Sequence, residues 1–278
     1  MMSPTSLTDH SKLCVHTITT KPWSVEESMD KYTEAGIGGI TVWRQWLEGR
    51  DIAKVGDQLR DRNLEIVSLC RGGFFPSKTE PGLKEAIEDN KLAIREAAEL
   101  GAPLIVLVCG AVPGQPLEES RKQIADGIAA VLPLAEEHNI KLAIEPLHPM
   151  YADDRSAINT MASANEVCDQ LNHPLAGIAA DVYHIWWDPD LEEQIRITGE
   201  KDRLFAFHIC DWMTPTADLL NDRGLMGEGC IDIPGIRAMV EATGFDGFNE
   251  VEVFSDRWWS QDQDTFLKAI KEAYLKHS

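Results

Sequence analysis

The sequence predicts a single α/β barrel of eight strand–helix repeats, the (β/α)₈ or TIM-barrel fold, and three observations predict it. Short apolar runs alternate with longer amphipathic segments along the whole chain, and eight such pairs can be counted. No Pro/Gly/Ser-rich linker or shift in composition divides the 278 residues, a length typical of one barrel. No glycine-rich nucleotide fingerprint follows a strand, which disfavours the alternative of a doubly wound open sheet. We expect one domain over residues 1–278, with residues 1–11 as a flexible N-terminal extension.

The expected strands are short, apolar and rich in β-branched residues or flanked by Gly and Pro, as buried parallel strands tend to be. They span residues 13–18, 39–43, 65–69, 104–109, 141–145, 177–181, 204–209 and 247–253. Helical periodicity between them predicts helices that include residues 24–35, 83–100 and 117–138. Ser24 followed by Glu27 has the pattern of an N-terminal capping box, and Gly36 and Gly101 stand where helices should end.

Two connections are longer than the others, residues 146–160 after the fifth strand and residues 211–232 after the seventh. In a barrel both lie at the carboxyl ends of the strands, which is the face where substrates bind. We therefore expect the chemistry of this chain at that face.

Composition narrows the class of protein. Hydrophobic residues at 44% and charged residues at 26% are the proportions of a globular domain, and the formal charge of −20 repels nucleic acid and anionic membranes. The six cysteines form no CxxC pair and resemble reduced thiols rather than a disulfide framework. The N-terminus has no signal-peptide pattern and no run is long enough for a membrane span. We expect a cytoplasmic protein with no nucleic-acid or membrane partner.

Polar residues that can bind a metal recur at the ends of the last four expected strands: Glu145, Asp181, His208 and Glu252. Alone, each is more often a loop anchor than a ligand. Together, three buried carboxylates without a cation would cost several kcal/mol per unpaired charge, which a divalent ion removes. Three carboxylates and one imidazole make a mostly oxygen site, so we expect Mn²⁺, with Mg²⁺, Co²⁺ or Zn²⁺ as alternatives.

The order and context of IEPLHP, DVYHIWW, FHICDW, GEGCID and VEVFS resemble the xylose isomerase-like barrel superfamily, and in particular its sugar phosphate isomerases/epimerases, including inosose isomerases and ketose 3-epimerases. The resemblance covers nearly the whole chain. It implies metal ligation by Glu145, Asp181, His208 and Glu252, and substrate contact by His184. It also implies proton transfer next to a carbonyl, with Glu145 and Glu252 as the acid/base pair and a metal-stabilised enediolate. Relatives are often dimers or tetramers, so the resemblance implies a homo-oligomer.

This chain departs from the ketose 3-epimerase pattern at two positions. Those enzymes carry a glutamate six residues after the first ligand and an arginine six after the metal histidine, where this chain has Tyr151 and Thr214. A plain ketohexose 3-epimerase is therefore disfavoured.

Further residues at or just past the strand ends are candidates for binding a small carbohydrate or polyol. They are Trp43, Arg44, Arg71, His148, Arg155 and Asp211, beside His184. Salt bridges or core packing explain most of them equally well. The pairs Trp186–Trp187 and Trp258–Trp259 can stack on sugar rings, but packing or an oligomer contact explains such pairs at least as often.

Three other functions compete with an isomerase or epimerase. A dehydratase or lyase acting on a keto-inositol or 3-keto-glycoside would use the same enolate chemistry. A phosphodiesterase like endonuclease IV needs a histidine-rich multi-zinc site, which eight histidines and a charge of −20 disfavour. A non-catalytic carbohydrate-binding barrel would have no reason to keep both flanking carboxylates. The absence of a phosphate-binding loop favours an unphosphorylated substrate.

Overall fold

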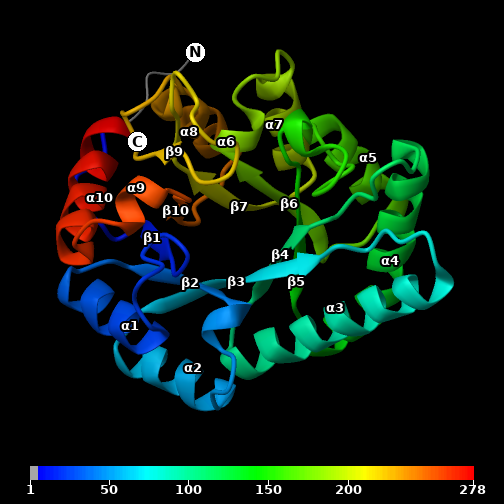
Figure 1. Ribbon diagram of the computed structural model, residues 1–278, viewed down its shortest axis with the longest axis horizontal. Helices are drawn as coiled ribbons and strands as arrows, with labels where there is room; N and C mark the ends of the chain where they lie inside the picture. The colour runs from blue at the N-terminus through cyan, green and yellow to red at the C-terminus, as the bar shows by residue number, and fades with distance from the viewer. Residues whose placement is uncertain (1–5) are drawn as a thin grey trace.

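The computed structural model describes residues 6–278, and its centre is a closed barrel of eight parallel strands (Figure 1). Neighbouring strands pair in chain order, and the first pairs with the last to close the barrel. The strands are β1 (Leu13–His16), β2 (Gly39–Trp43), β3 (Glu65–Gly73), β4 (Leu104–Val108), β5 (Lys141–Glu145), β6 (Ala176–Asp181), β7 (Leu204–Ile209) and β10 (Asn249–Val251). The predicted fold class is confirmed.

Helices surround the barrel on its outside (Figure 1). The longer ones are α1 (Val25–Glu34), α2 (Ile52–Asp61), α3 (Glu80–Leu100), α4 (Leu117–His138), α5 (Met161–Leu171), α7 (Leu191–Glu200), α8 (Ile233–Ala242) and α10 (Gln263–His277). Short turns of helix follow several strands: η1 (Arg44–Trp46), η2 (Pro149–Tyr151), α6 (Val182–Ile185) and α9 (Asp256–Trp259). Within the described residues, no helix combines the length and apolar character of a membrane span.

The predicted helix ends are confirmed where side-chain caps decide them. Ser24 and Glu27 form the capping box of α1, and the Ser24 side chain accepts from the Glu27 backbone N–H. Gly101 ends α3 in the left-handed conformation, with φ +86°. Helix α3 begins at Glu80, earlier than predicted, because Thr79 caps it and Pro81 is tolerated in a first turn.

Strand β3 is longer than predicted, because it continues to Gly73 instead of ending at residue 69, whereas β10 is shorter than the predicted residues 247–253. A bulge between Cys70 and Gly72 shifts its register against β4. Gly73 has φ +109°, and a Cβ there would lie 1.9 Å from the Val108 carbonyl oxygen, so only glycine fits. Asn90 of α3 bonds both the N–H and the carbonyl of Gly73 at 2.7 Å, which fixes the extended end of the strand.

Apolar side chains fill the space between barrel and helices, and a smaller group, including Val106, Ala143, Ala179 and Ala206, fills the barrel. All six cysteines are free, as expected. Part of the expected N-terminal extension, residues 1–5, lies outside the described residues. In the described part, the His10 ring lies 6.1 Å from that of Tyr274 on α10.

Candidate metal centre

The four predicted ligands come together at the carboxyl end of the barrel. Glu145, Asp181 and His208 lie at the ends of β5, β6 and β7, and Glu252 directly follows β10. One ligand atom from each lies within 4.8 Å of the others, and all four side chains are buried. Because parallel strands of a barrel end on the same face, residues far apart in sequence meet there. The convergence expected from the sequence is therefore present; we call these four residues the mouth group.

Unsatisfied polar atoms inside the mouth group fit a bound cation. Glu145 Oε1 and His208 Nδ1 lie 3.0 Å apart, the distance of an ion pair, and neither atom has a further partner within the described residues. Two buried atoms with no partner but each other can bind one cation together once the histidine is deprotonated. Oxygen and imidazole donors in this arrangement suit a divalent metal ion.

Arg223 is a residue of this site that the sequence analysis missed. Its guanidinium Nη1 donates to Asp181 Oδ2 at 3.0 Å and to Glu252 Oε2 at 2.8 Å, and the whole side chain is buried. Its Nη2 lies 3.2 Å from Nε2 of His184. The position six residues after His208 is Thr214, but an arginine nine residues further along the same loop reaches the site.

These contacts set the charge states of Glu252, Asp181 and His184. Burial opposes ionisation of Glu252, but Arg223 and His16 hold the pKa of Glu252 well below its usual range. Burial raises the pKa of Asp181 to about 7, against the opposing effect of Arg223. Burial and then Arg223 lower the pKa of His184 well below its usual range, so His184 is neutral at pH 7. Glu252 is thus an ionised base held by a cation, beside a neutral imidazole.

A second set of buried polar residues lies next to the mouth group: His16, Thr41, Ser68 and Glu250, here called the inner group. Alternation along a strand places residues two apart on the same face. Two residues before Glu145, Asp181 and His208 the chain has Ala143, Ala179 and Ala206, but two residues before Glu252 it has Glu250.

Glu250 is held by neighbours inside the barrel. Its Oε2 accepts from Thr41 Oγ1 at 2.6 Å and lies 3.1 Å from His16 Nε2. It also lies 3.8 Å from His208 Nε2, while the other nitrogen of His208 faces Glu145. Burial lowers the pKa of His208, but Glu250, Glu145 and Glu252 outweigh it and raise that pKa to about 10. Glu250 thus stands behind the histidine of the mouth group, as carboxylates often do behind metal-binding histidines.

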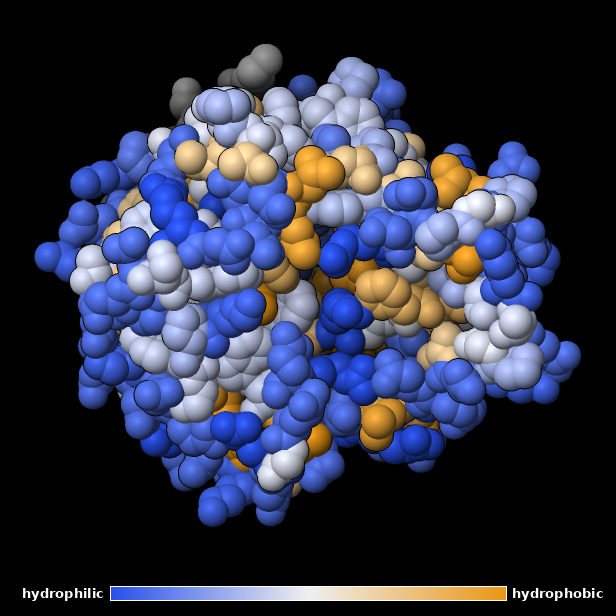
Figure 2. Space-filling model, in the orientation of Figure 1, coloured by the Kyte–Doolittle hydropathy of each residue, from blue (hydrophilic) through white to orange (hydrophobic). Residues whose placement is uncertain are grey.

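The mouth group borders a cavity of about 170 Å³. At about 30 Å³ per water molecule it holds five or six waters, the scale of one sugar or cyclitol ring. Four of the predicted substrate residues line it: Trp43, Arg71, Arg155 and His184. Hydrophilic side chains gather near the middle of the face shown in Figure 2, beside a few apolar ones.

Other predicted residues lie outside this cavity. The Asp211 carboxylate accepts backbone N–H bonds from Trp212, Gly227, Gly229 and Ile231 at 2.8 to 3.0 Å, so it organises its loop. The His148 ring packs between Trp187 and Trp212 and accepts from the Met150 N–H.

The remaining candidates have protein partners. Arg44 is paired with Asp89 and Glu96. Trp187 and Trp259 donate to backbone carbonyls, while Trp258 stacks on Phe266 with ring centroids 4.6 Å apart. Trp186 packs near Trp212 with centroids 5.7 Å apart. None of these residues lines the cavity, and their contacts are those of packing.

The loop after β7 covers the cavity. Its base is a short antiparallel pair, β8 (Asp211–Trp212) with β9 (Arg223–Gly224). Between them, the Leu219 carbonyl accepts from the hydroxyl groups of Tyr151 and Tyr183, and Leu220 lines the cavity. The loop therefore positions Arg223 at the site and forms part of the cavity wall.

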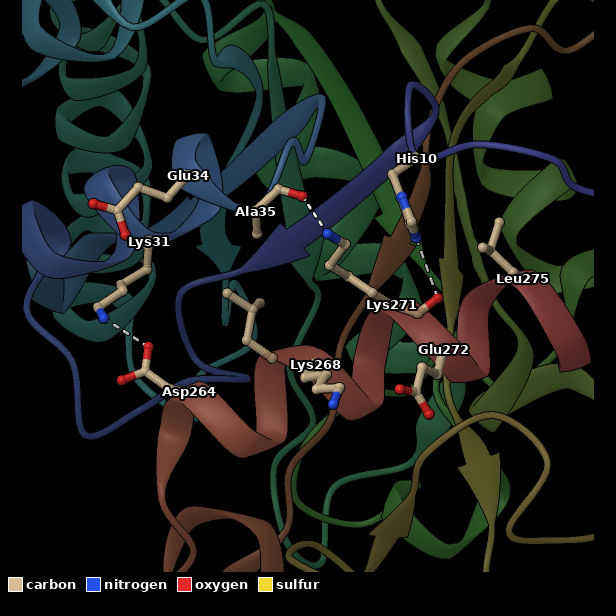
Figure 3. Close-up of a pocket in the computed structure, with 10 residues that line it drawn as sticks. His10, Lys31, Glu34, Ala35, Asp264, Lys268, Lys271, Glu272 and Leu275 are labelled. Atoms are coloured by element: carbon tan, nitrogen blue, oxygen red, sulfur yellow. Dashed lines mark hydrogen bonds and ion pairs between the residues drawn. The ribbon is translucent and has the colours of Figure 1, made fainter.

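A different hollow, of about 460 Å³, lies between α1 and α10 on the outside of the barrel (Figure 3). Its charged residues bond one another and the backbone: Lys31 pairs with Asp264 at 2.7 Å, and Lys271 donates to the Ala35 carbonyl. This hollow lacks the strand-end carboxylates, so the chemistry is assigned to the mouth group.

Comparison with known proteins agrees with this architecture. A crystal structure of protein SMc04130 from Sinorhizobium meliloti 1021 superimposes with a TM-score of 0.92 at 44% identity, covering 96% of this chain and 98% of that one. A structure of the IOLI protein with a bound zinc atom has the same fold, with a TM-score of 0.83 at 22% identity over 94% of this chain and 96% of that one.

Sequence relatives are enzymes. An inosose isomerase of Bacillus velezensis is 23% identical over 233 residues, 82% of this chain and 81% of its own length. A 3-dehydroshikimate dehydratase of Pseudomonas putida is 28% identical over 242 residues, 84% of this chain but 36% of its own length. The model of the xylose isomerase-like TIM barrel family matches residues 29–274. The chain therefore belongs to the xylose isomerase-like TIM barrel family.

Proposed function

We propose that this protein is a divalent-metal-dependent isomerase or epimerase acting on a sugar or polyol ketone. The observation that carries the proposal is the mouth group: three carboxylates and one imidazole converge beside a ring-sized cavity, with ligand atoms within 4.8 Å of one another. The inosose isomerase relatives support the same class of reaction.

Glu145, Asp181, His208 and Glu252 would hold the metal. When bound, the ion supplies positive charge that polarises a substrate carbonyl and stabilises negative charge developing on its oxygens. The mostly oxygen donor set favours Mn²⁺, with Mg²⁺, Co²⁺ and Zn²⁺ as alternatives, and the IOLI structure with zinc supports a divalent ion.

Glu145 and Glu252 would transfer the proton. They come from different strands and both line the cavity, so a ring between them presents one face to each. Glu252 is kept ionised by Arg223 and His16, which suits a proton acceptor. Glu145 lies in the cavity wall, where its carboxylate can reach a substrate proton. Arg223 and the neutral His184 would orient substrate oxygens.

A second candidate is a dehydratase or lyase on a keto-inositol or 3-keto-glycoside. The similarity to a 3-dehydroshikimate dehydratase favours it. Such an enzyme removes the same proton but then expels an oxygen from the next carbon, so the two reactions share Glu145 and Glu252 and differ in the product.

The test is NMR in D₂O of Mn²⁺-loaded protein with ketoses, inososes and 3-keto-glycosides. Deuterium entering next to the carbonyl of an intact skeleton indicates an isomerase or epimerase. Release of water or of an aglycone with an unsaturated product indicates the lyase. A protein that binds no metal and exchanges no proton in any of these compounds would refute both.

A further inference from the structure

We propose that the cavity takes a ketone that carries an anionic group, a carboxylate or a phosphate ester, and that Arg71 and Arg155 bind that group. The inference rests on the proposed function, because it names the class of substrate for the same cavity. It departs from the unphosphorylated, neutral ketone that the sequence favours.

Arg71 and Arg155 both line the cavity, and neither has a carboxylate partner among residues 6–278. This is unusual in a chain with 46 acidic and 26 basic residues, where carboxylates are in excess. Arg44, close by, illustrates the ordinary case, because Asp89 and Glu96 neutralise it. Two partly buried guanidinium groups without a protein partner indicate that the partner is a ligand.

Each guanidinium is supported by an aromatic face. Arg71 lies 4.2 Å from the ring centroid of Phe74, and Arg155 lies 5.5 Å from that of Tyr151. Stacking uses the flat face of a guanidinium and leaves its in-plane N–H groups available, which is the geometry that binds carboxylate or phosphate.

The fold fixes both arginines at this place. Arg71 is the extra residue of the β3 bulge, with Cys70 opposite Val106 and Gly72 opposite Leu107. Bulges near active sites commonly redirect a side chain. The backbone of Arg155 is held by a bond from the Gly110 N–H to its carbonyl at 2.9 Å.

Charge in the cavity gives an independent argument. The negative charges of Glu145, Asp181 and Glu252 are balanced by Arg223 together with a divalent ion, while Glu250 is paired with His16. Arg71 and Arg155 then remain as two positive charges that nothing in the site neutralises. Burial, and then the neighbouring charges of Arg155 and Arg44, hold the pKa of Arg71 below its usual value, a strain that an anion would relieve.

The anionic group would lie inside the cavity and not in the neighbouring groove. A groove of about 640 Å³ shares Arg71 with the cavity, but Glu48, Asp89 and Glu96 also line it. Because these carboxylates would repel an anion, the anionic group would stay beside Arg71 and Arg155, with the ketone end of the substrate facing the mouth group.

The experiment compares three molecules that differ only at carbon 6: D-fructose, D-fructuronate and D-fructose 6-phosphate. Binding of each, and of inorganic phosphate, to Mn²⁺-loaded protein is measured by calorimetry, and solvent exchange is followed by NMR in D₂O. We expect one of the two anionic ketoses to bind at least tenfold more tightly than D-fructose, and which one it is distinguishes a carboxylate from a phosphate substrate.

Arg71→Met and Arg155→Met should each weaken that binding by about tenfold or more, and by a larger factor than they weaken binding of D-fructose. Arg71→Lys should lose less than Arg71→Met because it keeps the charge. Arg50→Met removes the same charge from a surface pair with Glu26 and should change nothing. Thermal unfolding of each variant separates loss of binding from loss of fold.

The inference is overturned if no anionic probe, inorganic phosphate included, binds more tightly than D-fructose, or if the two Met variants bind the anions as wild type does. Its failure and that of the proposed function look different. Arginine-dependent anion binding without deuterium exchange in any ketone would retain the anion subsite and count against the isomerase. Deuterium exchange that neither arginine substitution changes would support the isomerase and count against the anion subsite.

Discussion

The mouth group and the inner group are both buried polar sets in one barrel, and they differ in how their polar atoms are satisfied. In the mouth group, Glu145 Oε1 and His208 Nδ1 have no partner but each other, and His208 Nε2 has no hydrogen-bond partner among the described residues. In the inner group, Ser68 contacts Thr41 at 3.0 Å, Thr41 donates to Glu250, and His16 meets Glu250 at 3.1 Å. A buried set with unpaired atoms is arranged for a ligand, whereas a satisfied one stabilises and orients its neighbours.

The two groups are joined at two places. His16 Nδ1 lies 3.1 Å from Glu252 Oε1, and Glu250 lies 3.8 Å from His208 Nε2. The inner group thus contacts Glu252 and lies beside His208, the imidazole of the mouth group. This difference in role predicts effects of different kinds and sizes for substitutions in each group.

The largest expected effect follows substitution of the two carboxylates in the mouth group. Glu145→Gln and Glu252→Gln should each lower deuterium exchange in a responsive ketone by about 10³-fold, within the range for loss of a general acid or base. Glu65→Gln, an exposed glutamate at the start of β3, is the matched control. Either Gln variant keeping a tenth of the wild-type rate would remove that residue from the mechanism.

In metal-free protein, a substitution in the inner group should lower stability more than a substitution in the mouth group. Glu250→Gln should lower the free energy of unfolding by about 3 kcal/mol, because it breaks the buried pair with His16 and weakens the bond from Thr41. Glu145→Gln should lower it by only about 1 kcal/mol, since His208 keeps the nearby carboxylates of Glu250 and Glu252. Urea unfolding of chelator-treated protein measures both, and equal losses would abolish the distinction.

Added metal should stabilise the fold by binding to the mouth group. Mn²⁺ at a hundred times its dissociation constant should stabilise the fold by about 2.7 kcal/mol, and chelation should reverse it. The Glu250→Gln variant should still bind Mn²⁺, but about 10 to 100-fold more weakly, because the carboxylate behind His208 is lost. Calorimetric titration tests this; unchanged affinity would show that Glu250 serves stability alone.

Asp211→Asn should have a smaller and local effect. Four backbone N–H groups converge on the Asp211 carboxylate, and an amide can satisfy them only in part. We expect a loss of about 2 kcal/mol and faster hydrogen exchange in residues 225–231, with little change at β5 or β6. Faster exchange throughout the barrel would mean that Asp211 supports more than its loop.

The smallest effect is expected at exposed ion pairs. Arg196 is paired with Glu193 and Glu200 on the surface of α7. Because water and salt screen such pairs, Arg196→Ala should leave the melting temperature unchanged within error. This variant gives the baseline against which losses at the two buried groups are read.

Much of the fold follows from the sequence because barrel strands have a strong pattern. Strands β2, β5 and β7 have the predicted bounds, and the apolar runs of β2 and β5 end at Trp43 and Glu145. The end of β3 could not be predicted, because the bulge depends on Asn90 of a distant helix and on the space beside Val108.

The mouth group was predictable because each member ends a strand. The sequence also indicates the inner group, because Glu250 precedes Glu252 by two residues and His16 lies near the end of the first strand. No sequence pattern predicts Arg223 at the site, because its position depends on how the loop of residues 211–232 folds on Asp211. Substrate contact by Asp211 and His148 stays a prediction from their position after strands; in the structure the Asp211 carboxylate accepts from backbone N–H groups and the His148 ring packs on aromatic neighbours.

The two-residue pairing of β8 with β9 divides the covering loop into a fixed base and a variable tip. Trp212 pairs with Arg223 and Asp211 with Gly224, so the position of Arg223 is set below the tip. Residues 213–222 could then be lengthened, shortened or exchanged without moving the arginine that contacts Asp181 and Glu252. This arrangement lets the choice of substrate diverge separately from the catalytic chemistry, and it marks the tip as the segment to graft when a new specificity is wanted on this barrel.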